Sequence, residues 1–419
     1  MSLFLREYER SMGQHTDAPS IFHPACSYSI FGALLTRRKY RCVLAGGVPP
    51  RWTNLWMLLV GDSGESRKTT CISMAHEVMR RVDETIDAPT DGSPEGLLGW
   101  LSKRHQQEEN NASGIIVAGE FALMLTQYER SYAIAMKPLL MELFDVPAIK
   151  KRALAKSEFV IPQPRISMLG GVAIELLPTM STAEDWLGGF FSRCMLIHGV
   201  KDRHEKRGGT PTEGEYLKHA DNLHGVMRRW RNSQLKLKRP LFDYDEGALT
   251  VVDKLPKPPD EPNLKMSLAR ASVHLHKLAA IEQIDENPES KFIGKKATQR
   301  ALDYIMDAWW KRVPEVIDEC FARGRGDFEG DRLAKRIHRY VIRHGGECSW
   351  AEVMRGCALK SDEVRKAITS LEDAQMVKLG EGTGGEVTVT AIAVNREAVE
   401  VVEAKPKKSK AKKKDKDKA

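Results

Sequence analysis

The sequence predicts an α/β protein with a parallel, doubly wound sheet, followed by a small α+β module. Short apolar runs alternate with segments of helical spacing, which is typical of parallel strands joined by crossover helices; the runs are 54–60, 114–118, 166–169 and 194–197. Near the C-terminus, helical patterns precede an alternating hairpin. At 419 residues the chain exceeds the usual size of one core, so we expect at least two folded units.

The cysteines and the N-terminal residues indicate the cellular compartment of the protein. The 7 cysteines form an odd set without CxxC pairs, so we expect reduced thiols. No apolar run has the length of a membrane span, and charged residues stand where a signal peptide would need its apolar segment; they are Arg6, Glu7, Glu9 and Arg10. We therefore predict a cytoplasmic protein that has no membrane partner.

The net charge of +8 comes almost entirely from the C-terminal tail. Residues 405–419 hold nine Lys and two Asp, so 9 − 2 = +7 belongs to the tail and 8 − 7 = +1 to the rest. Because the body is nearly neutral, its net charge gives no argument that it follows a phosphate backbone.

The string GDSGESRKTT at 61–70 lies between the predicted strand 54–60 and a helical pattern at 71–86. That is the context of a P-loop, whose glycines let backbone N–H groups face nucleotide phosphates. The lysine of such a loop reaches the β and γ oxygens, and the following hydroxyl holds Mg²⁺. The sequence therefore predicts ATP and Mg²⁺ as cofactors, with Thr69 on the metal; the candidate binding residues are Gly61, Gly64, Ser66, Arg67, Lys68, Thr69 and Thr70.

The loop departs from the strict GxxxxGK[ST] pattern in two ways. Gly61 lies seven rather than six residues before Lys68, and Arg67 replaces a glycine. A Gly-Ser turn capping an ordinary helix is the alternative interpretation.

Two further residues are catalytic candidates alongside Lys68. Glu120 follows the apolar strand 113–118, where a Walker B carboxylate would orient the attacking water; Gly119 replaces the usual Asp. A charge that starts a helix is the alternative for Glu120. Arg193 precedes the strand 194–197 and is a candidate finger for a neighbouring subunit's γ-phosphate, although a surface ion pair is the commoner role.

Several segments, in this order, carry a family resemblance between about 25 and 285. They are NLWMLLVGDSGESRKTT, DGSPEGLLGWLS, GIIVAGEFALML, LLMELFDVP, ISMLGGVAIELL, GGFFSRCMLI and RASVHLHKLA. The chain resembles the phage, plasmid and mobile-element family of helicase- and primase-associated P-loop ATPases, whose core is often described only as a domain of unknown function.

The resemblance implies a RecA/AAA+-like ATPase core in the bacterial cytoplasm. It implies a homo-oligomeric ring, such as a hexamer, that acts on single-stranded or forked DNA beside a separate primase or polymerase. Lys68 and Thr69 would bind nucleotide and metal, and Glu120 would activate water. Arg193 would act on a neighbouring subunit, and Arg270 would sense phosphate from a lid. Asp145, in the LFDVP-like segment, receives no chemical role and is interpreted as a helix-end cap.

A winged helix is predicted near the C-terminus. Helical patterns at 331–345, 349–357 and 361–374 precede two strands that alternate about the turn 380–385. The third helix of such a fold can enter the major groove of DNA, and here it presents Arg365 and Lys366. Acidic residues on the same helix keep protein docking as an alternative.

The tail is a second candidate DNA contact, because a flexible polycation releases counterions when it neutralises phosphates. A solubilising end is the alternative. The candidate residues in the tail are Lys407, Lys408, Lys412 and Lys413.

We thus expect five segments. They are an N-terminal helical segment (1–45), the P-loop ATPase core (46–285), a helical lid or linker (286–325), the winged helix (326–395) and a Lys-rich tail (396–419). The leading hypothesis is a DNA-dependent ATPase, a replicative helicase or helicase-like motor. The alternative is a nucleotide-gated DNA-binding adaptor with slow or no hydrolysis, which Gly119 and the altered loop favour. A plain transcriptional repressor would leave the strand-loop-helix core unexplained.

Overall fold

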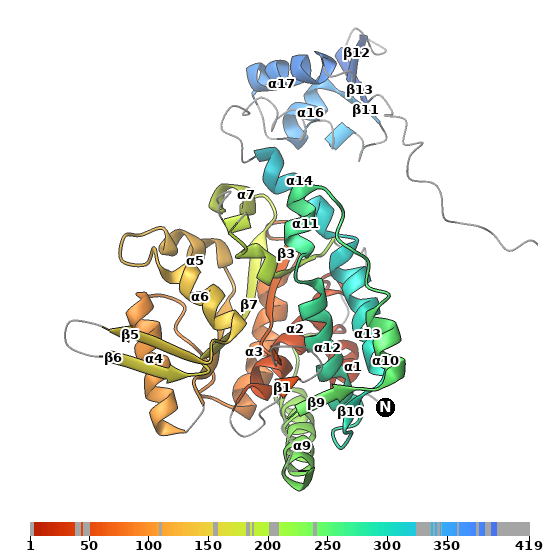
Figure 1. Cartoon of the computed structure of the whole chain (residues 1–419). Helices are drawn as coiled ribbons and strands as arrows, with labels where there is room; N and C mark the ends of the chain where they lie inside the picture. Colours follow the sequence, from red (N-terminus) through yellow and green to blue (C-terminus); the bar gives the residue numbers. More distant parts are fainter. Residues whose placement is uncertain are drawn as a thin grey trace, which may run out of the picture. The chain divides into compact units, whose positions relative to one another are not determined.

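The computed structural model divides the chain into two compact units, residues 1–324 and 325–419 (Figure 1). The described residues of the first unit are 4–37, 43–44, 51–108, 111–153, 158–181, 185–186, 188–200, 209–237 and 241–323. Those of the second are 337, 340–341, 344, 346–357, 360–373, 377–381 and 387–391.

The first unit is built around a four-stranded parallel sheet with strand order β4-β7-β3-β8. Its strands are β3 (Trp56–Gly61), β4 (Ser113–Ala118), β7 (Arg165–Ala173) and β8 (Met195–His198). Every residue of β3, β7 and β8 is buried, as expected for strands covered on both faces. The prediction of an α/β protein with a parallel sheet is therefore confirmed.

The strand predicted at 166–169 continues through two glycines as β7. The glycines fit because both faces of the sheet are crowded there. A Cβ on Gly170 would lie 2.8 Å from Leu58 Cδ2, and one on Gly171 would lie 2.9 Å from the Gly119 carbonyl oxygen. A neighbouring side chain and a backbone carbonyl thus occupy the space that larger residues would need.

Helices cover both faces of this sheet (Figure 1). On one face lie α2 (Phe22–Leu35) and α3 (Lys68–Val82); on the other lie α5 (Phe121–Tyr128) and α6 (Met136–Asp145). Outside α2, the helices α12 (Ala271–Glu286) and α13 (Lys295–Tyr304) form a further helical layer.

Helical spacing runs through 263–284 and through 295–321, but the structure breaks both segments. The pattern at 263–284 forms α11 (Pro262–Leu268) and α12, with a turn at Arg270. The pattern at 295–321 forms α13, a π-helix (Ile305–Trp310) and α14 (Val313–Arg323). Pro314 explains the second restart, because proline cannot donate the hydrogen bond that would continue the preceding helix.

The remaining elements of the first unit are short or peripheral. They are α1 (Leu5–Met12), β1 (Val43–Leu44), β2 (Arg51–Trp52), α4 (Pro94–Gln107), β5 (Ile149–Ala153), β6 (Glu158–Pro162), α7 (Leu177–Met180), the 3-10 turn η2 (Phe191–Arg193), α9 (Glu213–Leu237), β9 (Leu241–Tyr244), α10 (Glu246–Val252) and β10 (Phe292–Ile293). A second, mixed sheet has the order β10-β9-β1-β2, and β5 pairs with β6 as an antiparallel hairpin.

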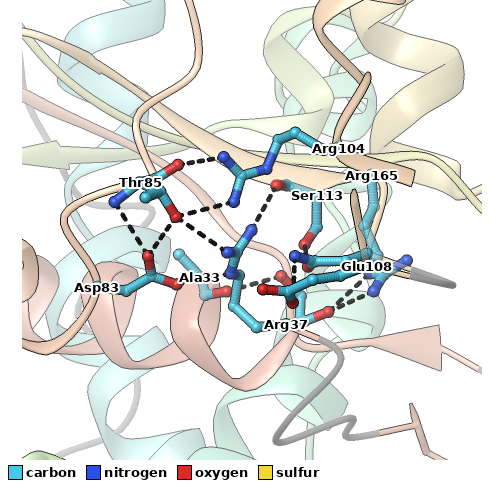
Figure 2. A network of polar contacts seen from close by, with 10 residues as sticks. Ala33, Arg37, Asp83, Thr85, Arg104, Glu108, Ser113 and Arg165 are labelled. Atoms are coloured by element: carbon cyan, nitrogen blue, oxygen red, sulfur yellow. Dashed lines mark hydrogen bonds and ion pairs between the residues drawn. The ribbon is translucent and has the colours of Figure 1, made fainter. Parts of the chain in front are cut away.

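A polar network holds the amino end of the parallel sheet (Figure 2). Arg37, just after α2, donates to the Asp83 carboxylate at 2.8 Å, to the Ser113 carbonyl at 3.2 Å and to the Thr85 hydroxyl at 3.3 Å. Arg104 of α4 donates to the carbonyl and hydroxyl of Thr85. These contacts tie the ends of α2 and α3 to α4 and to the start of β4. We call these five residues the amino-end network.

Arg165, the first residue of β7, lies beside this network (Figure 2). Its guanidinium donates to the carbonyl groups of Thr36 and Gln163 and lies 3.9 Å from the centre of the Trp52 ring. Only 1% of Arg165 is exposed. Protein acceptors and an aromatic face thus replace the water that such a buried cation loses.

The second unit has its own small apolar core. It contains β11 (Glu347–Ser349), α16 (Trp350–Gly356), α17 (Ser361–Asp373), β12 (Val377–Glu381) and β13 (Val387–Ala391), with an antiparallel sheet of order β11-β13-β12. The predictions of helices at 349–357 and 361–374 and of the following hairpin are confirmed. The helix predicted at 331–345 lies mostly outside the described residues.

Candidate functional site

The candidate site lies where β3 ends at the carboxyl edge of the parallel sheet. The loop from Gly61 to Arg67 leads directly into α3. Two loop residues have positive φ: Gly64 at 74° and Arg67 at 51°. A left-handed conformation costs a residue with a side chain about 1 kcal/mol, so the loop holds Arg67 in a mildly strained state. Arg67 stands where the strict motif has glycine, and it adopts the backbone conformation that glycine favours.

Lys68 is the first residue of α3, and its side chain turns back onto the loop. Its Nζ donates to the carbonyl oxygens of Gly61 and Asp62 at 3.0 and 2.9 Å and to the Ser66 hydroxyl at 2.8 Å. The loop is tight, because a Cβ on Gly61 would lie 2.9 Å from Ser66 Oγ. These contacts direct a buried ammonium group into the concave side of the loop.

The N-terminus of α3 offers hydrogen-bond donors to an anion. The first backbone N–H groups of a helix have no partner within it, and the helix dipole places partial positive charge there. Within the described residues, no side chain caps the α3 N-terminus. Thr69 and Thr70 are exposed in this first turn. Together with the Lys68 ammonium, these donors form an arrangement suited to phosphate groups.

Two glutamates flank the loop at the same edge of the sheet. Glu120 follows β4, and Glu175 lies two residues beyond β7. Because β7 pairs with both β3 and β4, Glu175 follows the strand that lies between the loop strand and the Glu120 strand. The two outer strands are separated by two strand spacings, about 10 Å. Both glutamates are exposed.

Electrostatics link these groups. Burial lowers the pKa of the Lys68 ammonium, while the charges of Glu175, Glu120 and Asp62 raise it, and the net shift is downward. The two glutamates are therefore near enough to interact with the Lys68 charge. This edge of the sheet thus carries both positive and negative side chains. Such an arrangement can hold an anion against the lysine while carboxylates face a metal ion or water.

Gly119 is in contact with the residue predicted to bind metal. A Cβ at position 119 would lie 3.2 Å from Thr69 Cγ2 and 4.0 Å from Thr69 Oγ1. Position 119 thus faces Thr69, but it supplies no carboxylate to the hydroxyl. In the described part of the chain, no group of three or more His, Cys, Asp or Glu side chains could hold a metal ion. A Mg²⁺ ion here would depend on Thr69, the nearby glutamates, phosphate oxygens and water.

Arg193 and Arg270 lie at the opposite end of the sheet. Arg193 is two residues before β8, whose first residue pairs with Met57 near the start of β3. Four residues of extended chain, about 13 Å, separate Met57 from Gly61, and Arg193 precedes the residue that pairs with Met57. The structure therefore does not bring the predicted finger and phosphate sensor to the loop of the same chain.

Asp145 joins these two arginines. Its carboxylate accepts from Arg193 Nε at 3.2 Å and from Arg270 Nη1 at 2.7 Å. Arg193 also donates to the Gly189 carbonyl at 2.7 Å. Asp145 ends α6, as its interpretation as a helix-end residue suggests, but its carboxylate also links η2 to the start of α12.

The predicted DNA contacts fall partly outside the described residues. Arg365 is exposed on α17, and Lys366 lies in the same helix. The four candidate lysines of the tail, Lys407, Lys408, Lys412 and Lys413, lie outside the described residues.

Sequence reasoning missed Glu175 and Asp62. A signal for Glu175 was present, because a carboxylate that follows a buried strand reaches the edge where a phosphate loop would bind its ligand. The strand was predicted to end at residue 169, so Glu175 did not look like a residue that follows it directly. No sequence pattern distinguishes Asp62 from other acidic loop residues.

Comparison with protein-family models finds no match, and no curated protein matches the sequence. Among the described residues, no helix is long and apolar enough to cross a membrane.

Proposed function

We propose that the first unit is a P-loop ATPase core of the RecA/AAA+-like kind and that the chain is a DNA-dependent ATPase. The main support is the Lys68 ammonium, which the loop oxygens hold at the N-terminus of α3. Burial lowers its pKa, and the charges of Glu175 and Glu120, which follow β7 and β4, raise it. Phosphate binding at a helix N-terminus and water activation by a nearby carboxylate require these groups on one edge.

The roles follow from the positions of the residues. Lys68 and the N–H groups of the first turn of α3 bind the phosphates, and Thr69 holds Mg²⁺. Glu120 is the candidate base that orients the attacking water, with Glu175 as a second carboxylate between it and the loop. Mg²⁺ held there by Thr69 would neutralise phosphate charge.

The proposed action on DNA depends on the second unit and on the family resemblance. The second unit is proposed to be a winged helix that contacts DNA through α17, with Arg365 exposed on it. By its family resemblance, the chain acts in the cytoplasm as a homo-oligomeric helicase-like motor of a phage or mobile element, beside a separate primase or polymerase. In such a ring, Arg193 would act on a neighbouring subunit only after release from Asp145.

Gly119 favours a second candidate function, a nucleotide-gated DNA-binding adaptor that hydrolyses ATP slowly or not at all. Position 119 has no carboxylate that could accept a hydrogen bond from the Thr69 hydroxyl. Mg²⁺ binding at Thr69 would therefore be weaker. An adaptor needs only a nucleotide-bound state that differs from the free state.

Steady-state ATP hydrolysis, with and without single-stranded DNA, tests the proposal. Wild type would be compared with Lys68→Ala and Glu120→Gln, and with controls that change exposed residues elsewhere, Lys103→Ala and Glu246→Gln. We expect DNA-stimulated turnover that both site substitutions abolish and both controls retain. ATP binding without turnover in wild type would favour the adaptor, and absence of ATP binding would exclude both functions.

A further inference from the structure

The exposed face of α9 is strongly basic. The sequence from 222 to 242 contains no Asp or Glu but six basic residues besides His224; they are Arg228, Arg229, Arg231, Lys236, Lys238 and Arg239. The near-neutral charge of the body therefore conceals a segment in which cations are segregated from acids.

The helix separates these cations from its buried side. Leu223, Val226, Met227 and Trp230 follow a helical spacing of three and four residues, and all are buried in the core of the first unit. The cations occupy the other side, where Arg228, Arg229, Arg231 and Lys236 are all exposed. We call these four residues the α9 basic face.

None of the four cations pairs with a carboxylate among the residues that the structure describes. Other exposed cations of the first unit do have acidic partners; for example, Lys218 of the same helix pairs with Glu7 at 2.5 Å. Cations near a helix C-terminus can be explained by the helix dipole, but only within the last turn. Only Lys236 lies in that turn, so the three arginines need another explanation.

We infer that the α9 basic face binds the phosphate backbone of nucleic acid, an inference that rests on the proposed action on DNA. Arg228 and Lys236 are eight residues apart, which spans about 12 Å along the helix axis. Successive phosphates of one strand are spaced by about 3.4 Å along a duplex axis, so the face can contact three or four of them. In Figure 1, α9 projects beyond β9 and β10.

The test is fluorescence anisotropy of a labelled oligothymidylate bound to the full chain, without ATP, over a range of salt concentrations. The variant Arg228→Glu/Arg231→Glu/Lys236→Glu reverses three charges of the face. The matched control Lys254→Glu/Lys257→Glu/Lys296→Glu makes the same change in net charge at exposed lysines outside α9. Thermal melting checks that both proteins fold.

We expect the α9 variant to bind on the order of tenfold more weakly than the control. The slope of log affinity against log salt should fall by about 2, because each lost phosphate contact with a single strand removes about 0.7. The neutral variant Arg228→Gln/Arg231→Gln/Lys236→Gln should lie between wild type and the reversal, which keeps the test decisive if the reversal fails to fold.

Equal affinity and equal salt slope in the α9 variant and the control would overturn the inference and leave the proposed ATPase intact. Binding to phosphatidylserine vesicles that depends on the face, without binding to the oligothymidylate, would also overturn it. ATP hydrolysis without DNA is measured on the same proteins and should be unchanged, so failure of the nucleotide site is recognised separately.

Discussion

Buried cations at the two ends of the parallel sheet have different kinds of hydrogen-bond partner. At the amino end, the guanidinium groups of Arg37 and Arg165 donate to protein carbonyl, hydroxyl and carboxylate oxygens. At the carboxyl end, the Lys68 ammonium donates only to the oxygens of its own loop, and the N-terminus of α3 beside it has no side-chain cap among the described residues. The arginines therefore join segments that are distant in sequence, whereas Lys68 holds only its own loop, and the uncapped N–H groups of α3 beside it can donate to an anion.

This difference separates stability from function. A buried arginine that donates to several elements ties them together, and its removal leaves buried acceptors and charges without partners. A lysine in a tight loop contributes less to the fold, because burial opposes its charge; the same burial lowers its pKa. We therefore expect substitutions at the two ends to have opposite consequences.

The largest expected effect is on Lys68. Lys68→Ala should lower ATP turnover by about 10³-fold, since it removes the cation that stabilises the phosphate charge in the transition state. Unfolding free energy should change by less than about 1 kcal/mol. Hydrolysis assays and urea denaturation check the two statements, with Lys103→Ala as the control. A large loss of stability would make Lys68 a structural residue.

Arg37→Ala should show the reverse behaviour. Breaking a buried ion pair costs about 3 kcal/mol, and this substitution also removes the hydrogen bonds to Ser113 and Thr85. ATP turnover per folded molecule should be retained. Tryptophan fluorescence during urea unfolding reports mainly on the first unit, because seven of the 8 tryptophans lie in residues 1–324.

Arg80→Ala is the matched control for Arg37→Ala. Arg80 is nearby on α3, but its side chain is 53% exposed and lies 3.8 Å from Asp87. Such a pair contributes less than about 1 kcal/mol. Equal losses from both arginines would show that the amino-end network has no special structural role.

The pH dependence of stability should also differ between the two ends. Burial lowers the pKa of His23, which lies in α2 beside Cys71 of α3, to about 4. Between pH 6.5 and 4, the unfolded chain binds a proton that the folded chain does not, so stability falls as pH falls. One such histidine contributes roughly 3 kcal/mol to this loss.

His23→Gln should therefore lose roughly 3 kcal/mol less than wild type across that window. Asp83 behaves differently: burial raises the pKa of its carboxyl, but Arg37 and Thr85 lower it by more, so the net shift is downward. Its contribution is present above the unfolded pKa of about 3.9 and is lost only as pH falls through the folded value. Urea unfolding at a series of pH values tests both statements, and an unchanged pH slope in His23→Gln would contradict the first.

The smallest expected effect concerns Glu175. Glu175→Gln should lower kcat by about tenfold with little change in KM, because the charge acts on the reacting groups rather than on ATP binding. Glu158→Gln, an exposed change on β6, serves as the control. Unchanged kcat would leave Glu120 as the only carboxylate needed at this edge.

Local sequence patterns were sufficient to predict the buried strands and a loop between β3 and the following helix. Continuous apolar runs predict strands covered on both faces, and the Gly-rich string before a helix predicts the loop. Strand ends were harder, because Gly170 and Gly171 look like breaks until the crowding by Leu58 and Gly119 is known. The break between α11 and α12 was equally hidden, since helical spacing continues through Arg270.

The order of residues along the chain therefore determines the class of fold and the chemical character of the loop at 61–70, because hydrophobic periodicity and glycine placement act locally. Tertiary structure alone decides which distant residues meet. The strand order places Glu175 between the loop and Glu120, and it directs Arg193 and Arg270 to Asp145 at the far end of the sheet. Those pairings depend on strand neighbours far apart in sequence, which no local pattern specifies.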